Sequence, residues 1–569
     1  MSQIVKLVKE QLYSLIQKTL PKEHMEYKIE VPADRSNGDF STNVAMVNSK
    51  IFSKAPRMVA EEILEQLDLA ETYFDKVEVA GPGFMNFYLK DEFYADILID
   101  ILNSGGNYGK SDFGEGKKVL VEFVSANPTG PMHMGNARGG ALGDCLATIL
   151  EWAGYYVERE FYINDAGNQI DKFGLSLDIR YQQYFKGEKI VELPEDSYHG
   201  DDIILLAKEF AEINGDRYLN ESEEVRRAAL VEFALPKNIE DMKAILAKYR
   251  IEYDTWFKES SLYETEVKDT IDELTKRGYT YESEDALWYK NIKVQTEILK
   301  AEGKSNEDIE KLELKDDVLV RANGNPTYFV ADIAYHRNKI KRGFDKSINI
   351  WGADHHGHVA RMQGALYALG FGAEKLDVLL MQLVRLVKDG EVVRMSKRTG
   401  KAIMLKDLLE EIPIDAVRFL FNMREAGSQM DFDLDLAVEQ SSQNPVYYCQ
   451  YAHARICSIL RKLEEDRIEI IPANKEDLML LKSFEERELI RHLSALTDEI
   501  VQAAKNYEPA RMTRYCIELA TLFHKFYNAC YVNVENEALR RARIHLCLCV
   551  KNVISNVLSM MKITVPEQM

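Results

Sequence analysis

The feature that most constrains the fold is a strand–loop–helix–strand pattern in the second hundred residues. Residues 118–124 are a mostly apolar run of strand length, and a loop rich in proline and glycine follows at 127–135. Apolar residues then recur at helical spacing up to Gly154, which can end a helix, and an alternating strand follows at 155–162. Strands joined through a helix lie parallel, so this stretch predicts a βαβ unit within a parallel sheet.

The same pattern returns later in the chain. Strands are predicted at 347–351 and at 378–387, the second of which ends in the turn former Asp389-Gly390. The residues between the two patterns, from about 170 to 310, are charged and largely helical. We therefore interpret them as an insertion between two halves of one nucleotide-binding domain.

Outside this domain, 1–110 mixes helices with a strand at 84–89, and beyond 440 apolar residues recur with the helical period. The predicted fold is α/β: a Rossmann-like parallel-sheet catalytic domain with a helical insertion, an α+β N-terminal domain and an all-α C-terminal bundle. The expected divisions are the N-terminal domain at 1–112, the two Rossmann halves at 113–175 and 311–405, the insertion at 176–310, linker helices at 406–440 and the bundle at 441–569.

Cysteine content and charge narrow the function classes. The seven cysteines are scattered without a C-x-x-C pair, which argues against a zinc ribbon and a disulfide framework. The N-terminus is amphipathic without the apolar core of a signal peptide, and no apolar run is long enough to span a bilayer. We expect a cytoplasmic protein without structural zinc. The net charge of −21 means that any nucleic-acid contact must use local basic patches, such as 394–401 or 540–543.

The loop 126–136 lies where a strand turns into a helix, which is the usual ligand site of doubly wound sheets. Amides at a helix N-terminus favour anions, Gly130 and Gly135 allow close backbone approach, and His133 can donate a hydrogen bond to a phosphate. A histidine beside a glycine is more often structural when considered alone, but its place at this switch favours nucleotide binding.

A second nucleotide signal is the basic segment 394–401, with four cations in eight residues. A glycine-ended basic loop suits a clamp on a triphosphate, where charge develops during phosphoryl chemistry. An exposed basic turn is the alternative, and it is the better interpretation of this segment by itself. The combination with loop 126–136 is what makes the signal specific.

Together these segments resemble the two signatures of class I aminoacyl-tRNA synthetases, in the form found in the arginyl-tRNA synthetase family. Loop 126–136 is similar to the HIGH motif, and 395–397 is similar to the KMSK loop. Two positions depart from the signatures: Asn136 stands for the final histidine of HIGH, and Arg394 for the first lysine of KMSK. Segments similar to the family's N-terminal, catalytic and anticodon-binding domains lie at 37–43, 83–87, 316–321, 326–329 and 444–455.

An arginine substrate needs carboxylates placed for bidentate contact, because a guanidinium is planar and permanently charged. Glu122 ends the first predicted strand, and Asp332 lies one helical turn after Tyr328, so both acids are aimed at the predicted cleft. A helix-surface aspartate is more often a solvated charge, which is the alternative for Asp332. The resemblance implies that arginine contacts Glu122, Ser125, Asn127, Tyr328 and Asp332, with Gln363 as the candidate glutamine of the pocket.

The resemblance also implies the remaining site residues. The catalytic residues would be His133, Asn136, Lys397 and Arg398; ATP would contact Gly130, Pro131, Gly135, Gly352, Asp354, His355, Met395 and Ser396; and tRNA would contact Asn37, Phe40, Asn43, Tyr448, Arg455 and Arg514. The histidine-rich stretch 352–358 could instead hold a metal, but the further acidic ligands of such sites are not found in matching order. We predict that it contacts the adenosine and that no metal ligands are present.

The reaction that the resemblance implies joins arginine to the terminal adenosine of tRNA(Arg) through an arginyl-adenylate. ATP is the cofactor, with Mg²⁺ carried by the nucleotide; the partners are tRNA(Arg), arginine and ATP, with no membrane, and we expect a monomer. The family commonly needs bound tRNA before the adenylate forms. Two alternatives stay open: another class I synthetase, for cysteine or glutamate, and a catalytically silent tRNA-binding paralogue.

Overall fold

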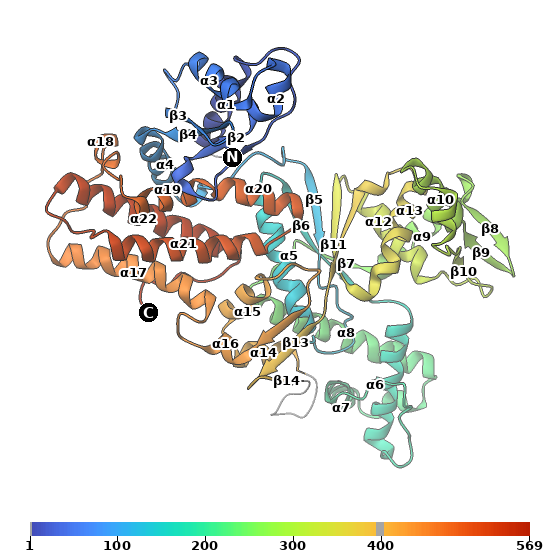
Figure 1. The fold of residues 1–569 in the computed structure, drawn as a ribbon. Coiled ribbons are helices and arrows are strands. Elements are labelled where there is room, and N and C mark those ends of the chain that lie inside the picture. The colour runs from blue at the N-terminus through green and yellow to red at the C-terminus, as the bar shows by residue number, and fades with distance from the viewer. Residues whose placement is uncertain (1–2, 394–402) are drawn as a thin grey trace.

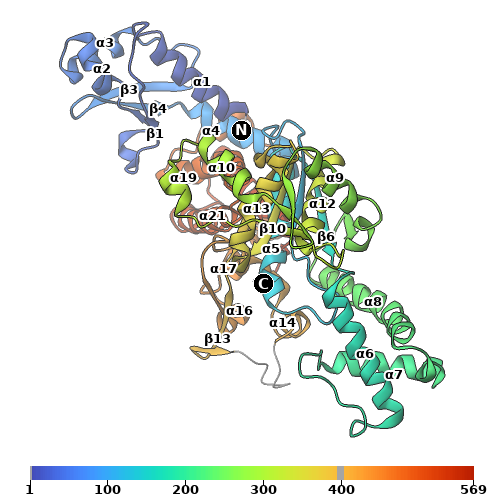
Figure 2. The same ribbon diagram turned by 90° about the vertical axis from the view of Figure 1, so that its right-hand side faces the viewer.

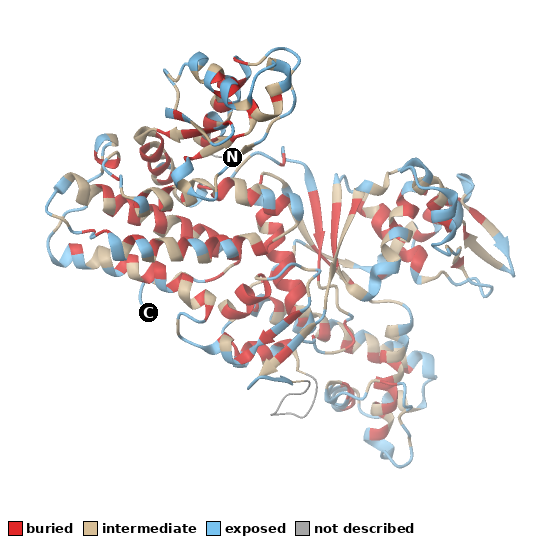
Figure 3. Cartoon of the chain, in the orientation of Figure 1, coloured by how far each residue is buried: buried red, intermediate tan, exposed pale blue. Residues whose placement is uncertain are grey.

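The structure is a computed structural model that describes residues 3–393 and 403–569. Its parts surround a central parallel sheet, with the N-terminal domain lying over the C-terminal helices (Figures 1 and 2). Red, buried segments run through the helical bundle and the central sheet (Figure 3). One insertion has a smaller core of its own, and the other shares a core with neighbouring helices of the catalytic domain.

The N-terminal domain is α+β, as predicted. Its antiparallel sheet has the order β1-β2-β4-β3, and Pro56 begins α3 at the first helical position, where its missing N–H costs nothing. The elements are α1 (Gln3–Gln17), β1 (Ile29–Glu30), β2 (Phe40–Thr42), α2 (Val44–Phe52), α3 (Pro56–Gln66), β3 (Phe74–Ala80), β4 (Phe84–Leu89) and α4 (Asp91–Ser104).

The central sheet confirms the predicted βαβ unit. Its five strands have the order β12-β11-β5-β6-β7 and all pair in parallel. Because the strands are parallel, their carboxyl ends meet at one edge, where Glu122 pairs in register with Asn349 of β11 and Glu160 of β6. The strands are β5 (Lys118–Glu122), β6 (Tyr156–Ile163), β7 (Thr255–Lys258), β11 (Lys346–Gly352) and β12 (Leu376–Met381), covered by α5 (Gly135–Trp152), α12 (Tyr328–Lys341) and α13 (His356–Ala368).

The prediction of a single helical insertion is wrong in one respect. In the middle of the predicted insertion, the chain returns to the central sheet. A helical arm comes first, then β7 joins the sheet beside β6, and a small α/β body follows. The arm is α6 (Asn168–Lys186), α7 (Asp201–Asn214) and α8 (Glu223–Lys248); the body is α9 (Glu266–Lys276), β8 (Thr280–Ser283), β9 (Ala286–Tyr289), α10 (Asn291–Ala301), α11 (Asn306–Glu310) and β10 (Asp317–Val320).

The strand predicted at 378–387 is two strands. β12 ends at Met381, and β13 starts a second sheet of order β14-β13-β15, so the chain leaves the central sheet here. Asp389 and Gly390 form the predicted turn, both with positive φ, of 53° and 76°, as a two-residue hairpin requires. The elements are β13 (Val384–Lys388), β14 (Glu391–Val393), α14 (Leu405–Glu411), α15 (Ile414–Phe421), β15 (Met430–Asp433) and α16 (Leu434–Val438).

The C-terminal part is all helical, as predicted. Its elements are α17 (Pro445–Glu465), α18 (Lys475–Leu478), α19 (Phe484–Ser494), α20 (Leu496–Asn506), α21 (Ala510–Ala529) and α22 (Glu537–Met560). Within residues 3–393 and 403–569, no helix has the length and apolar character needed to cross a membrane.

Candidate active site

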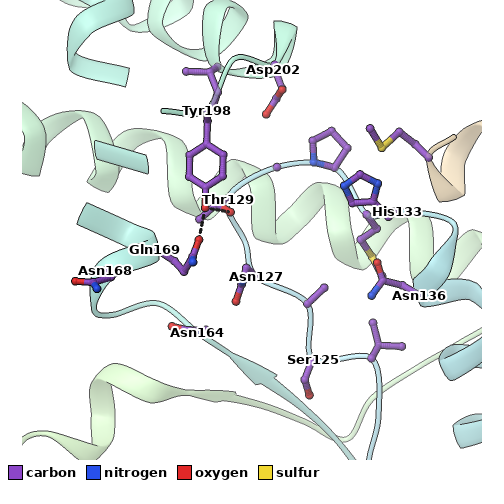
Figure 4. A pocket seen from close by; sticks show the side chains of 18 of the residues that line it. Ser125, Asn127, Thr129, His133, Asn136, Asn164, Asn168, Gln169, Tyr198 and Asp202 are labelled. Atoms are coloured by element: carbon purple, nitrogen blue, oxygen red, sulfur yellow. Dashed lines mark hydrogen bonds between the residues drawn. The ribbon is translucent and has the colours of Figure 1, made fainter. Parts of the chain in front are cut away.

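A cavity of about 1000 Å³ lies at the carboxyl ends of β5 and β6. The loop after β5 forms one wall with Asn127, His133 and Asn136, and the helical arm forms the opposite wall with Gln169, Tyr198 and Asp202 (Figure 4). The strand–helix switch therefore opens onto a cavity, as the sequence predicted. The contribution of the arm was not anticipated, because Tyr198 and Asp202 were assigned to an insertion and Gln169 to the first Rossmann half, each without a role in the site.

Many of the predicted substrate residues line this cavity: Ser125, Asn127, Gly130, Pro131, His133, Asn136, Tyr328 and His355. Tyr328 also ties two walls together, because its hydroxyl accepts a hydrogen bond of 2.8 Å from the backbone N–H of Asn168 on the arm. Gly135, Gly352 and Asp354 are not among the lining residues; Gly135 begins α5 and Gly352 ends β11.

The segment Met132–Met134 pairs with the chain that follows the basic segment. The N–H of Met134 donates to the carbonyl of Ile403 at 3.1 Å, and the N–H of Leu405 donates to that of Met132 at 2.8 Å. Met404 lines the cavity. The predicted residues Arg394, Met395, Ser396, Lys397 and Arg398 lie outside the described residues, but the chain that leaves this segment runs along the wall that carries His133.

An acidic wall lies beside the cavity, behind Ser125 and Tyr328. Asp332 is partly exposed, and one of its carboxylate oxygens is 3.1 Å from Nε2 of His358. Glu259 is almost completely buried and accepts a hydrogen bond of 2.9 Å from the Tyr263 hydroxyl; with its amide nitrogen turned inward, Asn164 donates to the same carboxylate at 2.7 Å. Burial, with a contribution from Asp332, raises the pKa of Glu259 to about 7.

Glu259 is the residue that sequence reasoning missed. It directly follows β7, just as Glu122 ends β5, so the same strand-end rule could have found it. Strand β7 was not predicted, because the sequence analysis assigned its region to helices. The backbone N–H and hydroxyl of Ser260 both donate to Asp165 at 2.8 Å, which fixes the turn after β7 to the end of β6 and positions Glu259 beside the cavity.

Three of the predicted arginine-binding residues do not line the cavity: Glu122, Gln363 and Asp332, which lies in the acidic wall beside it. Glu122 is buried and bound to Lys339 at 2.6 Å and to the Asn349 amide at 2.7 Å. Gln363 donates to the backbone carbonyl of Leu376 at 2.9 Å, so its amide serves the packing of α13 on β12. A contact between Gln363 and arginine therefore stays a prediction.

The histidine-rich stretch after β11 does not form a recognisable metal site. Among the described residues, no group of three or more histidine, cysteine, aspartate or glutamate side chains is placed to hold a metal ion. His355 lines the cavity and His358 contacts Asp332, so two of these histidines face the candidate site instead.

The predicted tRNA contacts lie in two domains, the C-terminal bundle and the N-terminal domain. On α17, the Tyr448 ring is 5.1 Å from that of His524, and the Arg455 guanidinium lies 4.4 Å over the ring of Tyr527, while Arg514 on α21 pairs with Glu508. In the N-terminal domain, Asn37 is exposed, Phe40 packs against Phe74, and the Asn43 side chain accepts from the N–H of Lys28 at 2.9 Å.

The structure combines a parallel sheet, loop 126–136 at its switch point, an acidic wall beside the cavity and a C-terminal helical bundle. This combination is that of a class I aminoacyl-tRNA synthetase. Three family models match: "Arginyl tRNA synthetase N terminal domain" at residues 2–89, "tRNA synthetases class I (R), catalytic domain" at 97–457 and "DALR anticodon binding domain" at 449–569. The chain belongs to the arginyl-tRNA synthetase family, and its reaction is the ATP-dependent joining of arginine to tRNA(Arg).

Arginine–tRNA ligases of other organisms match this chain over its whole length. The arginine–tRNA ligases of Acetivibrio thermocellus and of Caldanaerobacter subterraneus are each 52% identical to this chain over 581 residues, covering 100% of both chains. The solved arginyl-tRNA synthetase of Thermus thermophilus superposes with a TM-score of 0.74 at 22% identity, covering 100% of both chains, which shows a common fold. The alternatives of another class I synthetase or a silent paralogue find no support in these comparisons.

Proposed function

We propose that this ligase activates arginine in the cavity at the ends of β5 and β6, between loop 126–136 and the acidic wall. One observation carries the proposal: the loop that resembles a nucleotide-binding signature lines the same cavity as Tyr328, and the carboxylates of Glu259 and Asp332 lie beside it. A triphosphate and a guanidinium can therefore be held next to each other.

The guanidinium would lie against Asp332 and Glu259. Among the described residues, no lysine or arginine forms an ion pair with Glu259, whose carboxylate accepts only from neutral donors. A buried carboxylate without a cation favours a cationic ligand, because the ligand supplies the charge that the protein leaves out. Tyr328 would contact the side chain, and Ser125 and Asn127 the amino-acid end of the substrate.

The first step would be attack of the arginine carboxylate on the α-phosphorus of ATP, which releases pyrophosphate. A carboxylate is already ionised, so no general base is needed, and the protein contributes position and stabilisation of charge. His133 is exposed at the cavity wall and Asn136 lies at the N-terminus of α5, where amides favour phosphate oxygens. Lys397 and Arg398, with Met395 and Ser396, are proposed to meet the triphosphate from the other side.

Mg²⁺ would arrive with the triphosphate. This ion usually keeps several waters and binds through substrate phosphates, so it needs no cage of protein carboxylates. When bound, it would neutralise phosphate charge, and Gly130, Pro131 and His355 would contact the nucleotide that carries it.

In the second step, the terminal adenosine of tRNA(Arg) would take the arginyl group, through its 2′-hydroxyl. Asn37, Phe40 and Asn43 are proposed to contact the tRNA body, and Tyr448, Arg455 and Arg514 its anticodon end, where rings can stack on unpaired bases. We further propose that the enzyme works as a monomer in the cytoplasm, which fits seven buried, unpaired cysteines.

Pyrophosphate exchange with each amino acid, with and without total tRNA, tests this proposal. We expect exchange with arginine and with no other amino acid, and we expect it to depend on tRNA. Exchange with any other amino acid, or no exchange with arginine when tRNA is present, would contradict the proposal. A sedimentation measurement that found a stable dimer would contradict the proposed monomer separately.

The pH dependence tests the role of Glu259. Because its pKa is raised to about 7, the carboxylate is charged above pH 7 and gains a proton as the pH falls, so we expect the KM for arginine to rise below pH 7. Glu259→Gln should weaken arginine binding about 100-fold and remove most of this pH dependence. Asp332→Asn is the matched control: it should weaken arginine binding and keep a pH dependence, which moves to lower pH because Asp332 helps to raise the pKa of Glu259.

A further inference from the structure

One wall of the cavity, formed by the helical arm, has no role in the proposed reaction. Gln169, Tyr198 and Asp202 of the arm line the cavity opposite the part of the loop that carries His133 (Figure 4). The arm also has a hydrophobic core of its own, formed by α6, α7 and α8. Because this core holds the arm together, the polar contacts that the arm makes with the nucleotide loop can serve the site instead.

Tyr198 connects the arm to the first half of the nucleotide loop. Its hydroxyl accepts a hydrogen bond of 3.3 Å from the Thr129 hydroxyl and donates to the side-chain oxygen of Gln169, near the start of α6. Figure 4 shows the three side chains meeting at one side of the cavity. Thr129 is only 7% exposed, so this bridge joins a nearly buried residue of the loop to the arm.

Asn238 of α8 makes a second contact with the loop. Its amide donates to the carbonyl of Pro128 at 3.0 Å, and both residues are buried. Directly after α8, the Tyr249 hydroxyl donates to the carbonyl of Ala137 at 3.1 Å. The arm therefore holds the chain on both sides of His133. Asn238 is not one of the residues that line the cavity, so it can act on a substrate only through the loop.

The residues that are proposed to contact arginine are fixed in a different way. The Ser125 hydroxyl accepts from the backbone N–H of Tyr162 on β6 at 3.2 Å. The turn after β7 is tied to the end of β6 by the two hydrogen bonds of 2.8 Å between Ser260 and Asp165. Loss of the contacts from Tyr198 or Asn238 should therefore disturb the nucleotide loop and leave the arginine side of the cavity in place.

We propose that Tyr198 and Asn238 are positioning residues for ATP, which hold Pro128 and Thr129 so that the nucleotide loop meets the phosphates in a fixed geometry. This inference rests on the proposed function, since it assumes that ATP occupies the cavity beside loop 126–136. Catalysis by position depends on small displacements, so a loop that is held less firmly binds and activates the nucleotide less well. The arm is then a working part of the active site.

Steady-state kinetics of pyrophosphate exchange, with tRNA present, test the bridge. Tyr198→Phe removes the bridging hydroxyl and keeps the ring, and Thr129→Val removes its partner and keeps the shape. Each should raise the KM for ATP about 3- to 10-fold, the effect of one neutral hydrogen bond, and change the KM for arginine less than about 2-fold. The double variant should have no larger effect than Tyr198→Phe alone, because both changes break the same bond. Multiplied effects would overturn the bridge, since each hydroxyl would then act separately.

Asn238→Leu tests the second contact with a variant that cannot touch the substrate. Leucine fills a similar space without a donor and leaves the Pro128 carbonyl unpaired, so we expect the KM for ATP to rise about 10-fold. Tyr181→Phe is the matched control, because Tyr181 also lies in the arm but donates to the carbonyl of Gly215 at 2.6 Å, away from the cavity. It should lower the melting temperature and leave both KM values unchanged. If Asn238→Leu behaves like this control, the contact is only structural and the proposal is overturned.

His133→Ala distinguishes failure of this inference from failure of the proposed function. It should lower kcat/KM for ATP about 100-fold, because it removes a donor from the site of developing charge. If it leaves the ATP kinetics unchanged, the nucleotide does not occupy this cavity and the proposed function is wrong. If His133→Ala behaves as expected but Tyr198→Phe, Thr129→Val and Asn238→Leu leave the KM for ATP unchanged, the site stands and the role of the arm is overturned.

Discussion

The C-terminal bundle meets the rest of the chain at two junctions of different character. Against the N-terminal domain, α19 and α20 use partly exposed ion pairs, such as Lys9–Asp498 and Arg487–Asp91, with side chains 25–38% exposed. Where the bundle meets the catalytic domain, Lys562 of the bundle pairs with Asp144 of α5, which also pairs with Arg418 of α15, and neither Asp144 nor Arg418 is exposed. The same kind of interaction is therefore used in two very different environments.

The buried junction is a fully occupied network. Arg418 donates to the backbone carbonyls of Met561 at 2.5 Å and Tyr249 at 2.9 Å, and Lys562, just after α22, donates to Asp144 at 2.9 Å. Burial alone would raise the pKa of Asp144, but Arg418, Lys562 and Arg159 around it lower it. The carboxylate is therefore charged and joins three parts of the chain.

The different exposure of the ion pairs at the two junctions indicates which parts of the molecule are held together most firmly. Partly exposed ion pairs contribute roughly 0–1 kcal/mol each and are screened by salt, whereas breaking a buried pair costs about 3–5 kcal/mol. The buried ion pairs thus fix the bundle to the catalytic domain, whereas the partly exposed ion pairs of the N-terminal domain add little to the apolar packing of α4 against α18, α19 and α22.

The largest expected effect comes from breaking the buried junction. Arg418→Met leaves Asp144 charged with fewer partners, so we expect a loss of about 3–5 kcal/mol in the free energy of unfolding, measured by urea denaturation. Arg385→Met is the control, since Arg385 pairs with Asp431 at the surface, and should cost less than about 1 kcal/mol. Equal losses in the two variants would remove the distinction between the junctions.

An intermediate effect is expected at Asp39, which lies in the N-terminal junction but is nearly buried. Its carboxylate accepts from Arg491 at 2.5 Å, from the Tyr94 hydroxyl at 3.0 Å and from the N–H of Leu89 at 2.8 Å. Asp39→Asn should cost about 1–3 kcal/mol and raise hydrogen exchange in α4 and α19 while leaving α5 and α15 unchanged. Faster exchange in α5 would show that the junctions are coupled.

The smallest effect should come from Lys9→Met at the partly exposed edge. We expect a change below about 1 kcal/mol in low salt that disappears in 1 M NaCl, because the Debye length there is only about 3 Å. Thermal unfolding at the two salt concentrations measures it. A change that persisted in high salt would place this pair with the buried ones.

The sequence predicted the elements that local pattern controls. Three elements depend only on residues a few positions apart: the apolar run of β5, the helical spacing of α5 and the Asp389-Gly390 turn. The βαβ unit and the hairpin turn were therefore predicted correctly. The position of loop 126–136 at the edge of the sheet follows from the same rules.

What the sequence could not predict depends on partners far away in the chain. Lys339, 217 residues from Glu122, forms a buried ion pair with that carboxylate, and nothing in the local pattern around Glu122 reveals this partner. β7 is four residues long and becomes a strand only because β6 provides its hydrogen-bond partners, and Glu259 was missed with it. Single-sequence reasoning finds polar residues at strand ends but not which of them are already paired.

The order of strands in the central sheet has a consequence for how the polypeptide reaches its native state. β5 and β11 are neighbours, yet Glu122 and Asn349, which pair across them, are 227 residues apart in sequence. During synthesis the first strands must wait, with one edge unpaired, while the intervening residues emerge and the helical arm folds around its own small core. Such long-range parallel pairing is slow, so a newly made chain should depend on protection of this edge until β11 arrives.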